Sequence, residues 1–164
     1  MRILPVCAWI VCLGLSACSS PEQASGSAET ALSSSLLRTP LQDTAGRSVV
    51  LADELATGRK VALVFWQEWC ASCRAEAPQL VAASRKYSGL EIIGVVSGPD
   101  STVDAAALER AIRELDLPYR NVRDRELELT RALEITGTPT IVVLGGNGQV
   151  LYRGHAVPEW EALL

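Results

Sequence analysis

From the 164 residues of the chain we expect one folded domain of ordinary size. A composition of 48% hydrophobic and 21% charged residues excludes a disordered chain. The 15 Lys and Arg are scattered among 19 Asp and Glu, for a formal net charge of -4, and form no basic stripe. This charge pattern is not that of a nucleic-acid-binding protein, so we expect no nucleic-acid partner.

The N-terminal residues have the pattern of a secretory signal. Arg2 supplies a positive charge, and the apolar segment Ile3–Leu15 is too short to span a bilayer as a mature helix. The quartet LSAC, which ends at Cys18, resembles the lipobox of bacterial lipoproteins. That resemblance implies a signal peptide over residues 1–17 and a lipid anchor on Cys18. The alternative is an ordinary signal peptide that is cut elsewhere.

A polar segment follows the signal. Residues 18–35 consist of Cys18 and the run SSPEQASGSAETALSSS, which is small, polar and without aromatic side chains. Such a segment buries too little apolar surface to offset its ordering entropy. We therefore expect a flexible linker over 18–35 and a folded domain over 36–164.

Strand and helix patterns alternate in the first half of this domain. SVVL at 48–51 is expected to form a short strand. KVALVFW at 60–66 is apolar and rich in β-branched and aromatic residues, which is typical of a central strand buried on both faces. Residues 72–87 suit a helix with a kink at Pro78.

The alternation continues in the second half. Ser101, with Asp104 three residues on, resembles a capping box, and Asp124 is expected to be an N-cap. The expected elements are strands over 90–96, 140–144 and 149–152, helices over 101–115, 125–134 and 158–164, and a hairpin turn at 145–148. These elements predict an α/β fold with a mixed central β-sheet flanked by helices on both faces.

The cysteines narrow the choice of function. Cys7 and Cys12 would leave with the signal and Cys18 would carry lipid, so the folded domain keeps Cys70 and Cys73. A disulfide between residues three apart constrains the unfolded chain little, so a purely stabilising bond is a poor explanation. A metal site is also not expected, because two Cys and the single His do not complete the four ligands of structural zinc.

The predicted position of Cys70 favours redox chemistry. Cys70 follows a central strand and begins a helix, where unpaired N–H groups and the helix dipole stabilise a thiolate. We therefore expect Cys70 to be a solvent-accessible nucleophile. The spacing returns Cys73 to nearly the same helix face, where it can resolve a mixed disulfide on Cys70.

Three motifs carry a resemblance to a known family. WCASC after a strand, CRAEAP entering a helix, and GTPT further on resemble the thioredoxin superfamily, and more narrowly the TlpA/ResA-like thiol-disulfide oxidoreductases of bacterial envelopes. The resemblance covers 36–164 and implies a thioredoxin-like fold and disulfide exchange without a cofactor. It also implies a cis bond before Pro139, packing of Pro139 against the cysteine pair, and a Thr138 backbone that binds substrate peptide. The alternative is a trans Pro139 in a plain turn.

Glu76 lies one helical turn after Cys73. A partly buried carboxyl there would have a raised pKa and could relay a proton to or from Cys73. ResA-like proteins have a Glu at the matching position, which supports this role. The alternative is a solvated helix residue.

Two features depart from the family pattern. The residues between the cysteines lack the usual proline, and Glu68 precedes Cys70 by two. A carboxylate near Cys70 disfavours its thiolate and makes the dithiol a better reductant, whereas Arg74 acts in the opposite direction on Cys73. We therefore expect a reductant, unless Glu68 points into water.

The remaining candidate residues are aromatic side chains and the single histidine. Trp69 is expected to cover the Cys70 side, as the equivalent aromatic does in thioredoxins, and to contact substrate. Trp66 is expected in the core. For His155 we expect a surface or capping role, because one unpartnered His makes no catalytic constellation.

The resemblance also implies partners and a location. These are protein thiol or disulfide substrates, such as apocytochrome c, and a membrane electron donor of the DsbD or CcdA type. Ser19 and Ser20 after Cys18 resemble outer-membrane sorting, so we expect a lipid-anchored protein in the cell envelope.

Three other functions remain as alternatives. A peroxiredoxin-like peroxidase would need Pro and Thr where the chain has Leu63 and Gln67. A copper-handling thioredoxin-like chaperone would use CxxxC and a distal His, which the chain fits only through His155. A binding or scaffold lipoprotein would not depend on the two thiols at all.

Overall fold

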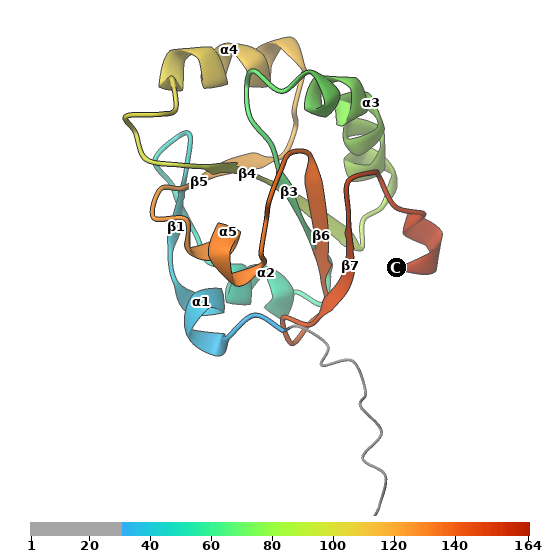
Figure 1. Ribbon diagram of the computed structural model, residues 1–164. Helices are drawn as coiled ribbons and strands as arrows, with labels where there is room; N and C mark the ends of the chain where they lie inside the picture. Colours follow the sequence, from blue (N-terminus) through green and yellow to red (C-terminus); the bar gives the residue numbers. More distant parts are fainter. Residues whose placement is uncertain (1–30) are drawn as a thin grey trace, which may run out of the picture.

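A mixed sheet of seven strands lies at the centre of the computed structural model, which describes residues 31–164 (Figure 1). The expected signal peptide, Cys18 and most of the expected linker lie outside the described residues. The strand order is β2-β1-β5-β4-β3-β6-β7. The strands are β1 (Leu41–Asp43), β2 (Ser48–Val49), β3 (Lys60–Phe65), β4 (Leu90–Ser97), β5 (Arg120–Asp124), β6 (Thr140–Leu144) and β7 (Val150–Gly154).

Parallel and antiparallel pairs coexist in this sheet. β3 pairs in parallel with β4, and β4 in parallel with β5, whereas β6 runs antiparallel to both β3 and β7. β1 is antiparallel to β2 and to β5. The expected mixed sheet is therefore confirmed.

Helices cover both faces of the sheet, as expected. They are α1 (Ser34–Arg38), α2 (Leu51–Ala56), α3 (Ala71–Lys86), α4 (Ala105–Glu114) and α5 (Glu128–Ala132), followed by a 3₁₀ turn at Trp160–Ala162. Side chains of α1, α2 and α5 share a core cluster on one face, and those of α3 and α4 pack on the other. No helix among residues 31–164 is long and apolar enough to cross a membrane.

The central strand β3 supplies both cores because successive side chains point to opposite faces. Leu63 and Phe65 belong to the cluster of α1, α2 and α5, whereas Ala62 and Val64 belong to the cluster that α3 covers. All four are at most 2% exposed. This burial on both faces explains why an unbroken apolar run predicted the strand correctly.

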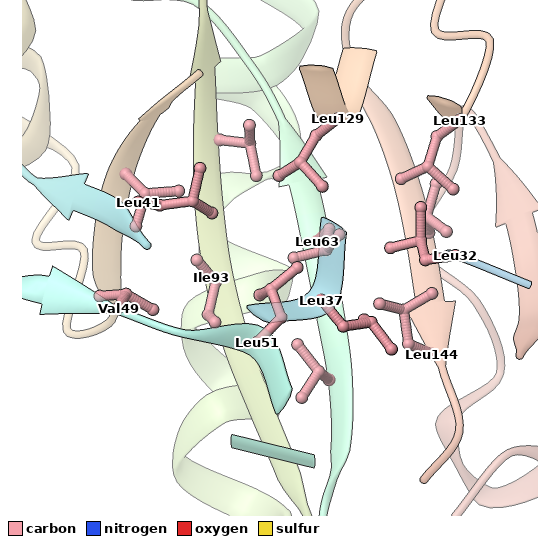
Figure 2. Close-up of a cluster of buried hydrophobic side chains, with 14 of the residues drawn as sticks. Leu32, Leu37, Leu41, Val49, Leu51, Leu63, Ile93, Leu129, Leu133 and Leu144 are labelled. Carbon is pink, nitrogen blue, oxygen red and sulfur yellow. The ribbon is translucent and has the colours of Figure 1, made fainter. Parts of the chain in front are cut away.

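The start of the described chain belongs to the fold. Ala31 forms a β-bridge with Gln149, and the N–H of Leu32 donates to the carbonyl of Gly148 at 3.0 Å. Figure 2 shows Leu32 and Leu37 in the same cluster as Leu63. The boundary expected at residue 36 thus falls inside α1, and residues 31–35 pack with the domain.

Several expected elements are confirmed with small shifts at their ends. The strands expected over 60–66, 90–96, 140–144 and 149–152 are β3, β4, β6 and β7, and the helix expected over 72–87 is α3. The final helix expected over 158–164 is only a 3₁₀ turn.

Other expectations were wrong in their details. The strand expected over 48–51 ends at Val49 because α2 begins at Leu51. α4 starts later than expected: Asp104, and not Ser101, is its N-cap and accepts from the N–H groups of Ala106 and Ala107.

Asp124 acts on α5 from a position that the sequence did not predict. It ends β5, and the N-cap position of α5 is Leu127. The carboxylate of Asp124 still accepts from the N–H groups of Leu129 at 3.4 Å and Thr130 at 2.9 Å. Asp124 therefore accepts hydrogen bonds from N–H groups at the start of α5, as an N-cap would, although it is not the N-cap residue.

Candidate active site

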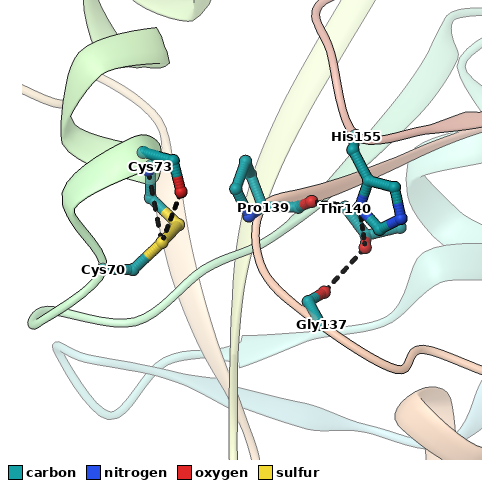
Figure 3. Close-up of a disulfide and its surroundings, with 7 residues drawn as sticks. Cys70, Cys73, Gly137, Pro139, Thr140 and His155 are labelled. Carbon is teal, nitrogen blue, oxygen red and sulfur yellow. Dashed lines mark hydrogen bonds between the residues drawn. A yellow bond between two sulfur atoms is a disulfide. The ribbon is translucent and has the colours of Figure 1, made fainter.

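Cys70 and Cys73 form a disulfide at the start of α3 (Figure 3). Cys70 is the N-cap, with extended backbone, and its sulfur accepts from the N–H of Cys73 at 3.2 Å. The strand β3 ends at Phe65, so the turn that follows the central strand delivers Cys70 to the helix terminus. Amide hydrogens and the helix dipole favour negative charge at this position, which is the condition for a stable thiolate on Cys70.

Burial does not distinguish the two cysteines. Cys70 is 5% exposed and Cys73 is 6% exposed, and both belong to the core cluster under α4. The expected solvent accessibility of Cys70 is therefore not seen in the disulfide form. The difference between the two sulfurs lies in position, since Cys70 caps the helix and Cys73 lies within its first turn.

Pro139 follows a cis peptide bond from Thr138, as expected. Pro139 and Cys73 line one cavity of about 10 Å³, which has room for about one water molecule. Figure 3 shows the proline ring facing the disulfide from the neighbouring loop. The fold thus brings the CxxC turn and the GTPT loop together from opposite ends of the domain sequence.

Glu76 lines the same cavity as Cys73. One of its carboxylate oxygens, Oε2, is buried and has no hydrogen-bond partner among the described residues. Burial raises the pKa of Glu76, and the charge of His155 opposes this only in part. Burial therefore makes the Glu76 carboxylate a stronger base than a solvated one, which suits a proton relay beside Cys73.

Trp66 and Tyr119 complete the polar part of the cavity wall. Trp66 is 3% exposed, as expected for a core residue, and its indole N–H donates to Asn121 at 2.9 Å. Burial raises the pKa of the Tyr119 hydroxyl. Sequence reasoning missed Tyr119 and Asn121, because both reach the site only through the pairing of β5 with β4.

Trp69 lies beside Cys70 in the chain and is 72% exposed. Most of the ring therefore faces solvent next to the disulfide. A large apolar side chain so exposed at a reactive site provides contact area for a partner.

Glu68 does not simply point into water. Its Oε2 atom is buried without a hydrogen-bond partner among the described residues. Glu68 interacts electrostatically with Arg123, which donates to the carbonyl of Gly98 at 2.9 Å. Burial lowers the pKa of Arg123, and the negative charges of Asp100 and Glu68 act in the opposite direction. No sequence signal pointed to Arg123, which lies on the unpredicted strand β5.

His155 contacts the cis-proline loop. Its Nδ1 lies 2.8 Å from the carbonyl oxygen of Pro139 and 3.3 Å from the hydroxyl of Thr140. This is a capping role at an exposed position, which agrees with the expectation for His155. Within residues 31–164, no three or more His, Cys, Asp or Glu side chains form a group that could hold a metal ion.

Comparison with known proteins agrees with this geometry. The sequence profile of the Redoxin family matches residues 24–162. The chain is 26% identical to the thiol-disulfide oxidoreductase ResA of Bacillus subtilis over 113 residues, which cover 68% of the chain and 60% of ResA. It is 32% identical to the thiol:disulfide interchange protein DsbE of Escherichia coli K12 over 114 residues, covering 67% of the chain and 58% of DsbE. The aligned part of the chain thus spans less than two thirds of these relatives.

Solved structures share the fold. A secreted disulfide oxidoreductase of Mycobacterium tuberculosis superposes with a TM-score of 0.65 at 19% identity, covering 80% of the chain and 95% of that protein. StoA of Bacillus subtilis superposes with a TM-score of 0.62 at 22% identity, covering 76% and 92%. These comparisons confirm the resemblance that WCASC and GTPT suggested.

Proposed function

Because the chain belongs to the Redoxin family, we propose that it is a thiol-disulfide oxidoreductase whose Cys70–Cys73 pair exchanges disulfides with proteins. The observation that carries this proposal is the position of the pair. Cys70 caps α3, and Cys73 shares a cavity with a cis-proline and a buried carboxyl. The relatives named as thiol-disulfide oxidoreductases and interchange proteins support the same chemistry.

The reaction proceeds in two exchanges. The Cys70 thiolate attacks one sulfur of a substrate disulfide, forms a mixed disulfide and releases the other substrate sulfur as a thiolate. Cys73 then loses its proton and attacks the Cys70 sulfur. The second substrate sulfur leaves, and the Cys70–Cys73 bond forms. Two electrons pass from the protein to the substrate, which ends as a dithiol.

Glu76 is proposed to handle the proton of Cys73. Its raised pKa makes the carboxylate a better proton acceptor, and its unpartnered oxygen is free to take a proton from Cys73 or return one. Deprotonation of Cys73 is needed for the second exchange in the reducing direction, and protonation is needed in the reverse direction.

The backbone of Thr138 and the ring of Trp69 are proposed to bind the substrate. Thr138 precedes the cis-proline in the loop before β6, where an extended peptide can pair with its main-chain groups. Trp69 adds exposed apolar area beside Cys70.

We further propose that the protein works as a reductant in the cell envelope, held by lipid on Cys18. Its electrons would come from a membrane thiol-disulfide transporter of the DsbD or CcdA type, and apocytochrome c is the proposed substrate. The buried carboxylate oxygen of Glu68 supports the reducing direction, because negative charge near Cys70 disfavours its thiolate.

Reduction of insulin disulfides tests the central proposal. The Cys70→Ser variant should lose all activity, and Cys73→Ser should accumulate a mixed disulfide with its substrate that reductant releases. A reduction potential of about -300 mV or lower supports the reductant, and one near about -120 mV would reverse the proposed direction. A wild-type protein that reduces no insulin disulfide would favour the binding lipoprotein, which does not depend on the two thiols.

A further inference from the structure

We propose that His155 is a positioning residue that prepares the backbone of Thr138 to bind substrate peptide. This inference rests on the proposed disulfide exchange with proteins. It concerns the loop Gly137–Thr140, which precedes and begins β6. His155 comes from a different segment, just after β7 ends at Gly154.

The hydrogen bonds of the loop fix the orientation of the imidazole. The carbonyl of Pro139 can only accept, so the His155 Nδ1 atom at 2.8 Å carries the hydrogen and donates. The hydroxyl of Thr140 donates to the carbonyl of Gly137 at 2.7 Å. Its lone pairs are therefore left to face the same Nδ1–H at 3.3 Å. The His155 imidazole thus donates toward Pro139 and Thr140, and the Thr140 hydroxyl donates on to Gly137 (Figure 3).

The hydrogen bonds from His155 and Thr140 engage the main-chain carbonyls of the residues on both sides of Thr138. The carbonyl of Gly137 accepts from Thr140, the carbonyl of Pro139 accepts from His155, and Pro139 has no N–H to offer. Within residues 31–164, by contrast, the N–H and carbonyl of Thr138 form no hydrogen bond. Thr138 is thus the one residue of Gly137–Pro139 with both main-chain groups available to an extended peptide.

Loss of His155 would mean that Thr138 is no longer the only residue of this loop with a free main-chain carbonyl beside the cis-proline. The Pro139 carbonyl becomes a free acceptor that water or a misaligned peptide can use, and the loop loses its tie to the end of β7. His155 touches the far side of Pro139 from the disulfide (Figure 3), and its charge acts on Glu76, which serves the second exchange and not the first attack by Cys70. The effect should therefore appear in peptide binding and not in the first attack of Cys70 on small disulfides.

The test compares reduced wild-type protein with His155→Leu and His155→Asn. Asparagine keeps an N–H donor close to the Nδ1 position, whereas leucine has none. With a disulfide-containing peptide, His155→Leu should raise KM about tenfold with kcat unchanged, as expected for one lost main-chain-orienting hydrogen bond. Asparagine should recover most of this loss. The first attack of Cys70 on hydroxyethyl disulfide, which has no peptide backbone, should be equally fast in all three proteins.

Thr140→Val provides a second variant, because it frees the Gly137 carbonyl and leaves the hydrogen bond from His155 to Pro139 in place. It should also raise KM for the peptide and spare the small disulfide. The inference is overturned if His155→Leu binds peptide like wild type, or if it slows both substrates equally. Failure of the proposed function is a separate result, in which wild-type protein itself reduces neither substrate.

Discussion

Trp66 and Asn121 are joined by a buried hydrogen bond of 2.9 Å that passes over Gly94. Gly94 lies on β4, and its register partners are Val64 on β3 and Asn121 on β5. A Cβ atom at Gly94 would lie 2.0 Å from Asn121 Oδ1 and 2.9 Å from Trp66 Nε1. The missing side chain of Gly94 is therefore what allows the wall of the active-site cavity to form.

Gly94→Ala should destabilise the protein strongly. The new methyl group overpacks a rigid sheet and breaks the bond between Trp66 and Asn121, at a cost of about 3 kcal/mol. Urea unfolding measures this change. Gly89→Ala is the matched control, because nothing lies within 4 Å of its added Cβ, and it should change stability by less than about 0.5 kcal/mol. Equal effects at the two glycines would contradict this account.

Glu76→Gln should stabilise the protein at neutral pH. The pKa of Glu76 is raised in the folded state, so the folded state holds its proton to higher pH than the unfolded state. The contribution of Glu76 to wild-type stability falls as the pH rises from its unfolded pKa through its folded one, so the stability of the Gln variant relative to wild type should rise over this range. Chemical unfolding at a series of pH values checks the difference. Glu109→Gln, on the surface of α4, should follow the wild-type curve.

The same variant should slow the second exchange. With Gln in place of Glu76, no carboxyl accepts the proton of Cys73, so we expect resolution of a mixed disulfide on Cys70 to slow about hundredfold. Stopped-flow measurement of thiol release from the preformed mixed disulfide isolates this step. The first attack by Cys70 should keep its wild-type rate, and a loss in both steps would argue against a specific role.

Arg120 should contribute to stability at the end of the sheet opposite the disulfide. It donates to Glu54 of α2 and to Glu91 of β4, each at 2.8 Å. Arg120→Met should destabilise by about 1–2 kcal/mol, since these side chains are only partly exposed. Arg85→Met removes an exposed pair with Asp116 and should cost less than about 0.5 kcal/mol.

The pH dependence of the Arg120→Met effect has a definite sign. The hydrogen bond from Arg120 is the main cause that lowers the pKa of Glu54. The stabilisation is therefore fully present above the unfolded pKa of Glu54 and is lost as the pH falls through its folded pKa. Unfolding curves of wild type and variant should converge in acid. A constant gap at all pH values would rule out the proposed linkage.

Trp69→Ala should separate binding from stability. Because Trp69 is 72% exposed, its removal should change the free energy of unfolding by less than about 0.5 kcal/mol. The rate of reaction with a peptide disulfide should fall about tenfold through loss of contact area. Thermal unfolding and peptide kinetics on one preparation test both halves of this prediction.

Long apolar segments made much of the fold predictable. β3, β4 and β6 are continuous apolar runs bounded by polar residues or turns, so their burial on both faces is visible in the sequence. The sequence RNVRD of β5 gave no such signal, although Asn121 and Arg123 are 2% and 7% exposed. Asn121 accepts from Trp66 and Arg123 donates to the carbonyl of Gly98, and one sequence does not reveal such distant partners.

Some residues of the active site could likewise be predicted from the sequence, and others could not. Cys70, Cys73 and Pro139 are recognisable because each depends on local geometry, namely a helix start or a turn. The contact of His155 with Pro139 depends on the pairing of β6 with β7 and has no local sequence signal. The structure is therefore needed to identify residues such as His155, which act through another residue.

The position of Ala31, where the described chain begins, determines where an upstream segment would join the domain. Ala31 pairs with Gln149 beside the turn between β6 and β7, where β6 ends at Leu144 opposite Val61. The sulfurs follow the other end of β3, and six residues of strand correspond to about 20 Å. A tether upstream of Ala31 would thus join the domain at the end of the sheet away from the disulfide.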